Sequence, residues 1–153
     1  MSSNLPSTSR SLPIALILAR EAVMAPIRDM LAESNITEQQ WRVLRMLNEH
    51  GPQDASTLAR RSGLLAPSLS RIVAAMEANG HLVREPDLED RRKQRLAMTE
   101  KGAAIIAHHL EDAGRIARRF RTALGDEDFD QLLDLLHKVA REVAEDAGDS
   151  PKP

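Results

Sequence analysis

The most informative stretch of the sequence is residues 55–98, which read ASTLARRSGLLAPSLSRIVAAMEANGHLVREPDLEDRRKQRLAM. Its first half predicts two short helices, at about 55–61 and 66–79, because apolar residues recur there at helical spacing. Between them lies Gly63, where a tight turn needs a left-handed backbone that branched residues resist. With Ala59 as the small residue at the crossing of the two helices, the pattern is typical of a helix-turn-helix.

A charged hairpin is predicted after the second helix. Residues 82–85 and 95–98 form short strand-like runs, and the loop between them contains Asp90-Arg91-Arg92-Lys93. An arginine on a protruding loop suits the negative potential of a narrow DNA minor groove, and Asp90 can hold one arginine through a bidentate pair. A solvated turn is the plain alternative for a charge run, but the neighbouring helices favour the DNA interpretation.

The second helix of the pair carries a slim exposed face. Its outward positions include Ser68, Ser70 and Arg71, and side chains of this size can enter a major groove about 12 Å wide. Taken alone, two short helices around a glycine are equally compatible with an ordinary structural pair. The hairpin that follows is what shifts the interpretation toward nucleic acid.

Longer helices flank this segment on both sides. Apolar spacing predicts them at about 12–31, 38–50, 99–123 and 129–143. Thr37 and Gln40 match a capping box at the start of the second of these, and Thr99 caps the third. We therefore expect a mainly α fold with a small β-wing, a winged helix-turn-helix that dimerises through its N- and C-terminal helices.

Composition narrows the function. Aromatic residues make up only 2% of the 153 residues, which argues against modules that stack bases on aromatic rings. The absence of cysteine excludes disulfides, thiolate zinc sites and cysteine redox sensing. No apolar run approaches the roughly 20 residues of a membrane span, so we expect a cytoplasmic protein without a membrane partner. The net charge is −2, yet residues 56–95 hold eight Arg or Lys against five Asp or Glu.

The hairpin and the residues after it resemble the MarR family of transcriptional regulators. The family's Asp-x-Arg wing signature is found as Asp90-Arg91-Arg92, followed at the family's spacing by LAMTEKG at 96–102. The resemblance extends from Leu12 to Val143, and it points to regulators of homoprotocatechuate and related aromatic-acid breakdown. The stretches that carry this narrower likeness are Ala15-Leu16, Ala19-Arg20-Glu21-Ala22, Thr37-Glu38-Gln39-Gln40-Trp41-Arg42, and Leu65 with Pro67-Ser68-Leu69.

The resemblance implies roles for residues of the wing and of the recognition helix. By this likeness Arg92 enters the minor groove, Asp90 supports it, and Arg91 and Lys93 contact phosphates. The residues assigned to the recognition helix are Ser68, Ser70 and Arg71. The departures from the family pattern are Leu65, where many members have a capping serine, and Ala66, where many have a longer polar side chain. No base contact is carried over to Ala66.

The family commonly binds small, often aromatic, anionic effectors between its dimerisation helices and its DNA-binding lobe. Arg20 lies in phase with the apolar residues of the first helix, so a cation interrupts an otherwise apolar stripe. The carboxylate of a ligand would pair with this guanidinium through two hydrogen bonds. An internal salt bridge, to Glu21 of a partner or to an acid of the long helices, is the alternative. Trp41 and Arg42 are candidates to line the same cleft, although Trp41 also fits a plain core role.

Metal binding and catalysis are not expected. Adjacent side chains on a helix point about 100° apart, so His108 and His109 are not expected to chelate one ion together, and His137 lies on another helix. No serine, histidine and acid group forms a recognisable catalytic arrangement, and no Gly-rich phosphate loop is present. We expect neither an enzyme nor a bound cofactor.

Together these patterns predict a homodimeric regulator of transcription, a repressor that binds a pseudo-palindromic site in double-stranded DNA. A small aromatic acid or its coenzyme A thioester is expected to release it. The expected segments are a flexible arm (1–11), dimerisation helices (12–34 and 100–145), the DNA-binding lobe (35–99) and an acidic tail (146–153). The alternative is a winged-helix module that binds another protein and no DNA.

Overall fold

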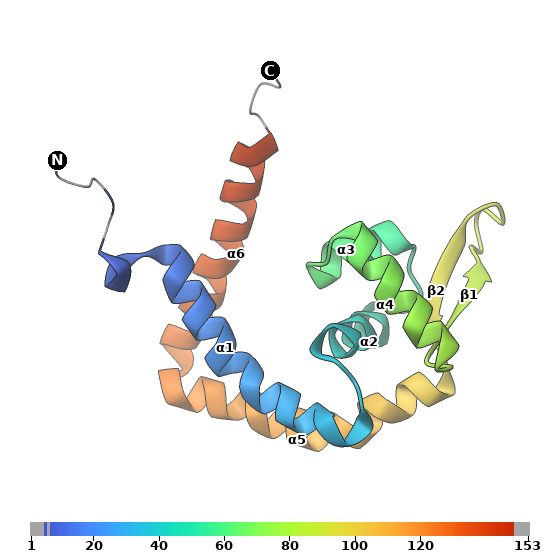
Figure 1. The fold of residues 1–153 in the computed structure, drawn as a ribbon, viewed down its shortest axis with the longest axis horizontal. Coiled ribbons are helices and arrows are strands. Elements are labelled where there is room, and N and C mark those ends of the chain that lie inside the picture. Colours follow the sequence, from blue (N-terminus) through green and yellow to red (C-terminus); the bar gives the residue numbers. More distant parts are fainter. Residues whose placement is uncertain (1–4, 6, 149–153) are drawn as a thin grey trace. The chain divides into compact units, whose positions relative to one another are not determined.

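The computed structural model describes residue 5 and residues 7–148, with side chains up to residue 144. In chain order the elements are η1 Thr8–Arg10, α1 Leu12–Leu31, η2 Ala32–Ser34, α2 Glu38–His50, α3 Ala55–Ser62, α4 Ala66–Ala78, β1 Leu82–Pro86, β2 Gln94–Met98, α5 Glu100–Leu124 and α6 Asp126–Gly148 (Figure 1). This mainly helical fold with one hairpin is the predicted class. None of the helices in the described ranges combines the length and apolarity needed to span a bilayer.

The chain divides into two units, residues 1–113 and 114–153, and α5 begins in the first and ends in the second. The first unit contains the hydrophobic core, which draws on the end of α1, on α2, α3 and α4, on both strands and on the start of α5. Its fully buried side chains include Leu31, Val43, Leu44, Leu58, Leu69, Val73, Met76, Leu82 and Leu96. This shared core fixes α4 and the base of the hairpin on one scaffold.

The helix-turn-helix forms as predicted. Gly63 adopts the left-handed conformation, with φ of 62°, and ends α3. The amide of Leu64 donates to the carbonyl of Ala59 over 3.0 Å, which closes the turn, and Ala59 is buried at the crossing. α4 then begins at Ala66 and presents its buried face, Leu69, Val73 and Met76, to the core.

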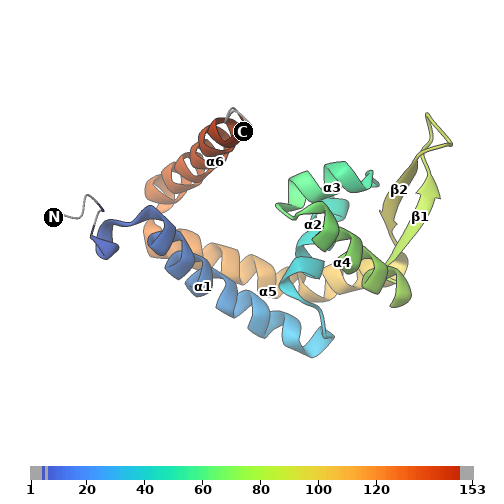
Figure 2. The same cartoon turned by 45° about the horizontal axis from the view of Figure 1, so that its top comes forward.

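The hairpin is antiparallel, and its register runs from Leu82 opposite Met98 to Pro86 opposite Gln94. Gln53 extends the pairing at the base through a bridge to Leu96, with N···O distances of 3.1 and 2.7 Å. In both views the tip projects away from the helices of the first unit, as expected of a wing (Figure 2).

The predicted capping box of α2 is confirmed. The Gln40 amide donates to Thr37 Oγ1 over 3.1 Å, and Gln40 Oε1 accepts from the Thr37 amide over 3.1 Å. Two backbone donors that no helical carbonyl can reach are thereby satisfied.

We expect Thr37→Ala to lower the free energy of unfolding by about 1 kcal/mol, because the Gln40 amide loses its side-chain acceptor. The measurement is urea denaturation followed by circular dichroism. Thr122→Ala, at an exposed position in the last turn of α5, is the matched control and should be neutral or slightly stabilising, since alanine is the better helix former. Equal losses in both variants would contradict the capping role.

The second unit consists of the end of α5 and all of α6. The two helices meet at Gly125, whose φ is 83°. Arg121 holds the corner, since its guanidinium contacts Asp126 at 3.2 Å and Asp130 at 2.9 Å and lies 4.5 Å from the centre of the Phe129 ring. No described side chain of α6 is fully buried within the chain.

The ends of the chain differ partly from expectation. Within the predicted arm of residues 1–11, the structure forms η1, while residues 1–4 and 6 lie outside the described residues. At the other end, α6 extends to Gly148, so the helix continues into the segment expected to be an acidic tail. Residues 149–153, the rest of that tail, lie outside the described residues.

Candidate nucleic-acid interface

The recognition-helix candidates are all exposed on α4, but they do not share one face. Ser68 and Arg71, one turn apart, line a groove together with the start of α2, where Gln39 and Gln40 lie. Ser70 lies elsewhere on the helix. It lines a second hollow together with Ser56 of α3 and Arg84 of β1. The first groove is also lined by Thr37, Leu64, Ile72 and Ala75, and the second hollow by Ala55, Ala59, Ala66, Leu69, Val73 and Leu96.

Sequence reasoning missed Gln39, Gln40, Ser56 and Arg84 as neighbours of the recognition helix. They come from α2, α3 and β1, and no local pattern marks them, because only the packing of the first unit brings these elements beside α4. Arg84 is held there by its Nε, which donates to Glu77 Oε1 over 2.9 Å.

The wing tip is ordered by its own aspartates. Asp87 Oδ1 accepts from the amides of Glu89 and Asp90 over 2.9 and 3.0 Å, which closes the loop. The Asp87 amide donates to the Lys93 carbonyl over 2.9 Å at the mouth of the loop. These backbone hydrogen bonds from Asp90 and Glu89 lower the pKa of the Asp87 carboxyl, so it stays ionised.

The predicted bidentate pair at the tip is present. Asp90 Oδ1 accepts from Arg92 Nε over 3.0 Å, and Asp90 Oδ2 accepts from Arg92 Nη2 over 3.3 Å. Hydrogen bonds from the Arg92 side chain and amide lower the pKa of Asp90. The Arg92 side chain is nevertheless 91% exposed, so its orientation is set while its outer surface remains accessible. Arg91 and Lys93 are exposed beside it.

The three effector candidates have different surroundings within the described part of the chain. Arg20, on α1, has a side chain that is 56% exposed and forms an ion pair with Glu38 at the start of α2. Trp41 is buried in the core with its ring edge-on to His109 at 5.8 Å. Arg42 extends toward the turn, with Nη1 3.9 Å from the position a Gly63 Cβ would take. The hollows that described residues line beside α4 and the wing include none of the three.

Arg20 therefore forms a salt bridge within a single chain, to an acid at the start of α2 and not to Glu21. Glu38 is the shared acceptor, because Arg28 Nη1 also lies 3.2 Å from Glu38 Oε2 while its Nη2 pairs with Glu21. The Glu38 side chain is only 10% exposed. Its desolvation raises the pKa of the carboxyl, but the hydrogen bonds from Arg20 and Arg28 outweigh that effect, and the net pKa is lowered.

This lowered pKa predicts a pH dependence of stability. Because the folded-state pKa of Glu38 lies below its ordinary value of 4.5, ionised Glu38 stabilises the fold above that pH, and the contribution is lost as the pH falls through the folded-state pKa. We expect Glu38→Gln to lower the midpoint of urea denaturation at about pH 7 more than at about pH 3.5. Glu142→Gln, at an exposed position of α6, is the control. An equal effect of Glu38→Gln at both pH values would contradict the prediction.

The side chains of His108 and His109 converge, although helix geometry separates the directions of their Cβ atoms by about 100°. Their ring centres lie 4.7 Å apart at an interplanar angle of 79°, and Glu33 contacts His108. His137 lies on α6, in the other unit, and is not part of this cluster.

Comparison with known proteins identifies the family. The sequence model of the MarR family matches residues 36–93. The homoprotocatechuate degradative operon repressor of Escherichia coli is 36% identical over 128 residues, which cover 84% of this chain and 86% of that protein.

Solved structures agree. The chain is 35% identical to the protein in the crystal structure of NadR in complex with 4-hydroxyphenylacetate, with a TM-score of 0.78. The match covers 92% of this chain and 99% of NadR. The transcriptional repressor CouR, solved bound to a 23-mer DNA duplex, is 30% identical to this chain, with a TM-score of 0.76. The match covers 90% of this chain and 99% of CouR. The chain belongs to the MarR family of transcriptional regulators.

Proposed function

We propose that the chain acts as a homodimer that binds a pseudo-palindromic site in double-stranded DNA and represses transcription. The observation that carries this proposal is the wing tip, where Asp90 orients an exposed Arg92. An oriented, solvent-facing guanidinium is suited to a narrow minor groove, where the negative potential is enhanced. Ser68 and Arg71 would enter the major groove. Ser70, which borders the other hollow beside α4, would contact the DNA there. Arg91 and Lys93 of the wing would contact phosphates.

The dimer is supported by apolar surface that each unit leaves exposed. α1 exposes Ile17 and Leu18, and it buries only Leu31 fully. α6 exposes Leu135 and Val143. Exposed apolar side chains on long helices are commonly covered by a partner, so we assign residues 12–34 and 100–145 to dimerisation and residues 35–99 to DNA binding. Two-fold symmetry then places the half-sites about 34–36 Å apart, one turn of B-DNA.

A titration of the protein with a duplex from its own promoter, followed by fluorescence anisotropy, tests this proposal. We expect the affinity to fall steeply as salt is raised from about 50 to 200 mM, since phosphate contacts release counterions. The promoter duplex should also bind more tightly than a shuffled duplex of equal length. Equal affinity for both duplexes at every salt concentration would contradict site-specific recognition. As a DNA-binding regulator the protein would act in the cytoplasm and would not be an enzyme.

A small aromatic carboxylate or its coenzyme A thioester is the effector we propose, with Arg20 as its anchor and Trp41 and Arg42 as accessory residues. Support comes from the half-exposed side chain of Arg20, whose guanidinium could exchange Glu38 for the carboxylate of a ligand. Release of DNA requires the effector to bind the DNA-free state more tightly than the DNA-bound state.

Thermal-shift screening of aromatic acids and their coenzyme A esters tests the effector. A true ligand at Arg20 should raise the melting temperature of the wild type and of Arg60→Ala, but much less that of Arg20→Ala. Arg60 is exposed on α3 and serves as the matched control. Stabilisation by none of these compounds would exclude this effector class, while the DNA titration would be unaffected.

A further inference from the structure

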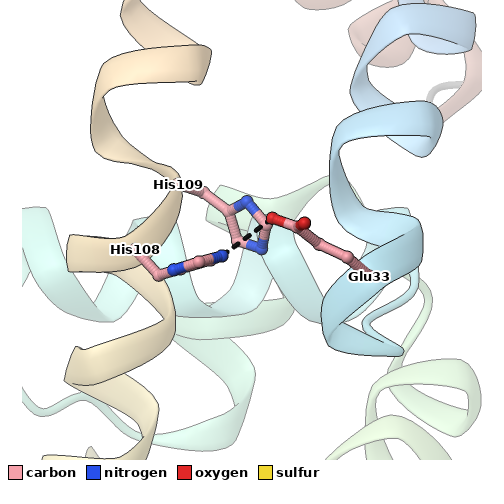
Figure 3. A group of neighbouring side chains, drawn as sticks. All are labelled: Glu33, His108 and His109. Atoms are coloured by element: carbon pink, nitrogen blue, oxygen red, sulfur yellow. Dashed lines mark hydrogen bonds and ion pairs between the residues drawn. The ribbon is translucent and has the colours of Figure 1, made fainter.

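We propose that Glu33, His108 and His109 form a binding site for a divalent first-row metal ion of the zinc class. One donor atom from each of the three side chains lies within 4.8 Å of the other two, and all belong to the first unit (Figure 3). Glu33 comes from η2, just after α1, and the histidines come from α5. The proposal is independent of the DNA-binding function.

The distances between the three side chains are close to those between the ligands of a metal ion. Glu33 Oε1 lies 2.7 Å from His108 Nε2, and the two histidine rings lie 4.7 Å apart (Figure 3). Two ligands of a tetrahedral zinc ion, each at about 2.0–2.1 Å, are about 3.3 Å apart. Small side-chain rotations that open the Glu33–His108 contact and draw His109 closer would admit the ion, without movement of the helices.

His109 has a buried ring nitrogen without a hydrogen-bond partner among the described residues. The residue is fully buried, and its Nε2 lies 2.6 Å from Ser34 Oγ, whereas its Nδ1 has no hydrogen-bond partner among the described residues. Buried polar atoms without a partner are rare in folded proteins. Metal-bound histidines commonly use one ring nitrogen for the ion and the other for a hydrogen bond that orients the ring. His109 therefore retains one ring nitrogen, Nδ1, that no described residue engages.

The donor set selects the class of ion. Two imidazoles and one carboxylate suit zinc and its first-row neighbours better than Mg²⁺ or Ca²⁺, which prefer oxygen ligands only. Glu33 and His108 are 63% and 59% exposed, so an ion can enter from solvent and keep a water as its fourth ligand. The ion would join η2 to α5 next to Trp41, whose ring packs on His109, and so would stabilise the core of the first unit.

Calorimetric titration of Zn²⁺ into the chelator-treated full chain tests the site. We expect one ion per chain, and a rise in melting temperature of about 5–10 °C when free Zn²⁺ exceeds its dissociation constant a hundredfold. Replacement of Zn²⁺ by Co²⁺ should give the visible absorption of a four-coordinate site with nitrogen ligands.

The variants His108→Ala and Glu33→Gln each remove a ligand from an exposed position, so both should fold, which the melting temperature of the metal-free protein verifies. Each should bind Zn²⁺ at least about tenfold more weakly and lose the thermal shift. His137→Ala, which removes an exposed histidine of α6, is the matched control and should bind as the wild type does. No saturable binding by the wild type, or undiminished binding by both ligand variants, would overturn the proposal and leave the cluster as a hydrogen-bonded pair beside a buried histidine.

Discussion

We expect Arg92→Ala to weaken binding to promoter DNA by about tenfold to a hundredfold, as is usual when an arginine that reads a groove is lost. Arg92 is suited to such a contact because the Asp90 carboxylate already orients it through two hydrogen bonds, at 3.0 and 3.3 Å, while its side chain stays 91% exposed. Little conformational entropy then remains to be lost when the arginine enters the groove.

Two further variants separate orientation from charge. Arg92→Lys keeps the positive charge but cannot form the bidentate pair, so it should recover only part of the lost affinity. Asp90→Ala keeps the guanidinium of Arg92 but removes the carboxylate that orients it, so its effect on affinity should be smaller than that of Arg92→Ala. Anisotropy titrations at two salt concentrations measure all three. Arg10→Ala, at an exposed position of η1, is the control for the loss of one charge.

The outcome also decides between the two interpretations of the winged helix. A module that binds only another protein would show the same weak, salt-dependent binding to DNA with and without Arg92. If Arg92→Ala and Arg71→Ala both leave promoter affinity unchanged, the DNA-binding proposal is wrong for these residues.

Local features of the fold could be predicted from the sequence because each depends on neighbouring residues. Thr37 and Gln40 are three positions apart, so their reciprocal hydrogen bonds form wherever the helix begins there. Gly63 marks a left-handed position by its lack of a side chain, and the structure confirms it. The Asp90–Arg92 pair spans only two positions.

Features that depend on packing could not be predicted. Ser70 and Arg71 are adjacent in sequence, yet they border different hollows, which are made by elements distant in the chain. Glu38 attracts Arg20 and Arg28 only because the end of α1 folds back on the start of α2. For His108 and His109, the helical rotation fixes the direction of each Cβ. It does not fix the position of the imidazole ring, because rotation about the Cα–Cβ and Cβ–Cγ bonds moves the ring.

Gly102→Ala should be strongly destabilising, although glycine is a poor helix former and Gly102 lies within α5. A Cβ at this position would lie 2.5 Å from the backbone carbonyl oxygen of His81 and 2.8 Å from Met98 Cγ. That carbonyl also accepts from the Thr99 amide over 3.1 Å, so the backbone cannot retreat without breaking the junction between the hairpin and α5. The glycine of the Thr99–Gly102 sequence is thus required for close approach of two backbone segments.

We expect Gly102→Ala to lower the free energy of unfolding by about 2–3 kcal/mol, because the overpacking exceeds the roughly 1 kcal/mol gained in helix propensity. For a chain of this size, that corresponds to a fall in melting temperature of about 5–10 °C. Gly114→Ala is the matched control in the same helix, since its Cβ would meet only the flexible Arg118 Nη1 at 3.2 Å. It should raise the melting temperature slightly, as helix propensity alone predicts. If both variants instead shift the melting temperature in the same direction, helix propensity and not the contact with His81 governs the position, and the close approach of the hairpin to α5 is not what requires a glycine there.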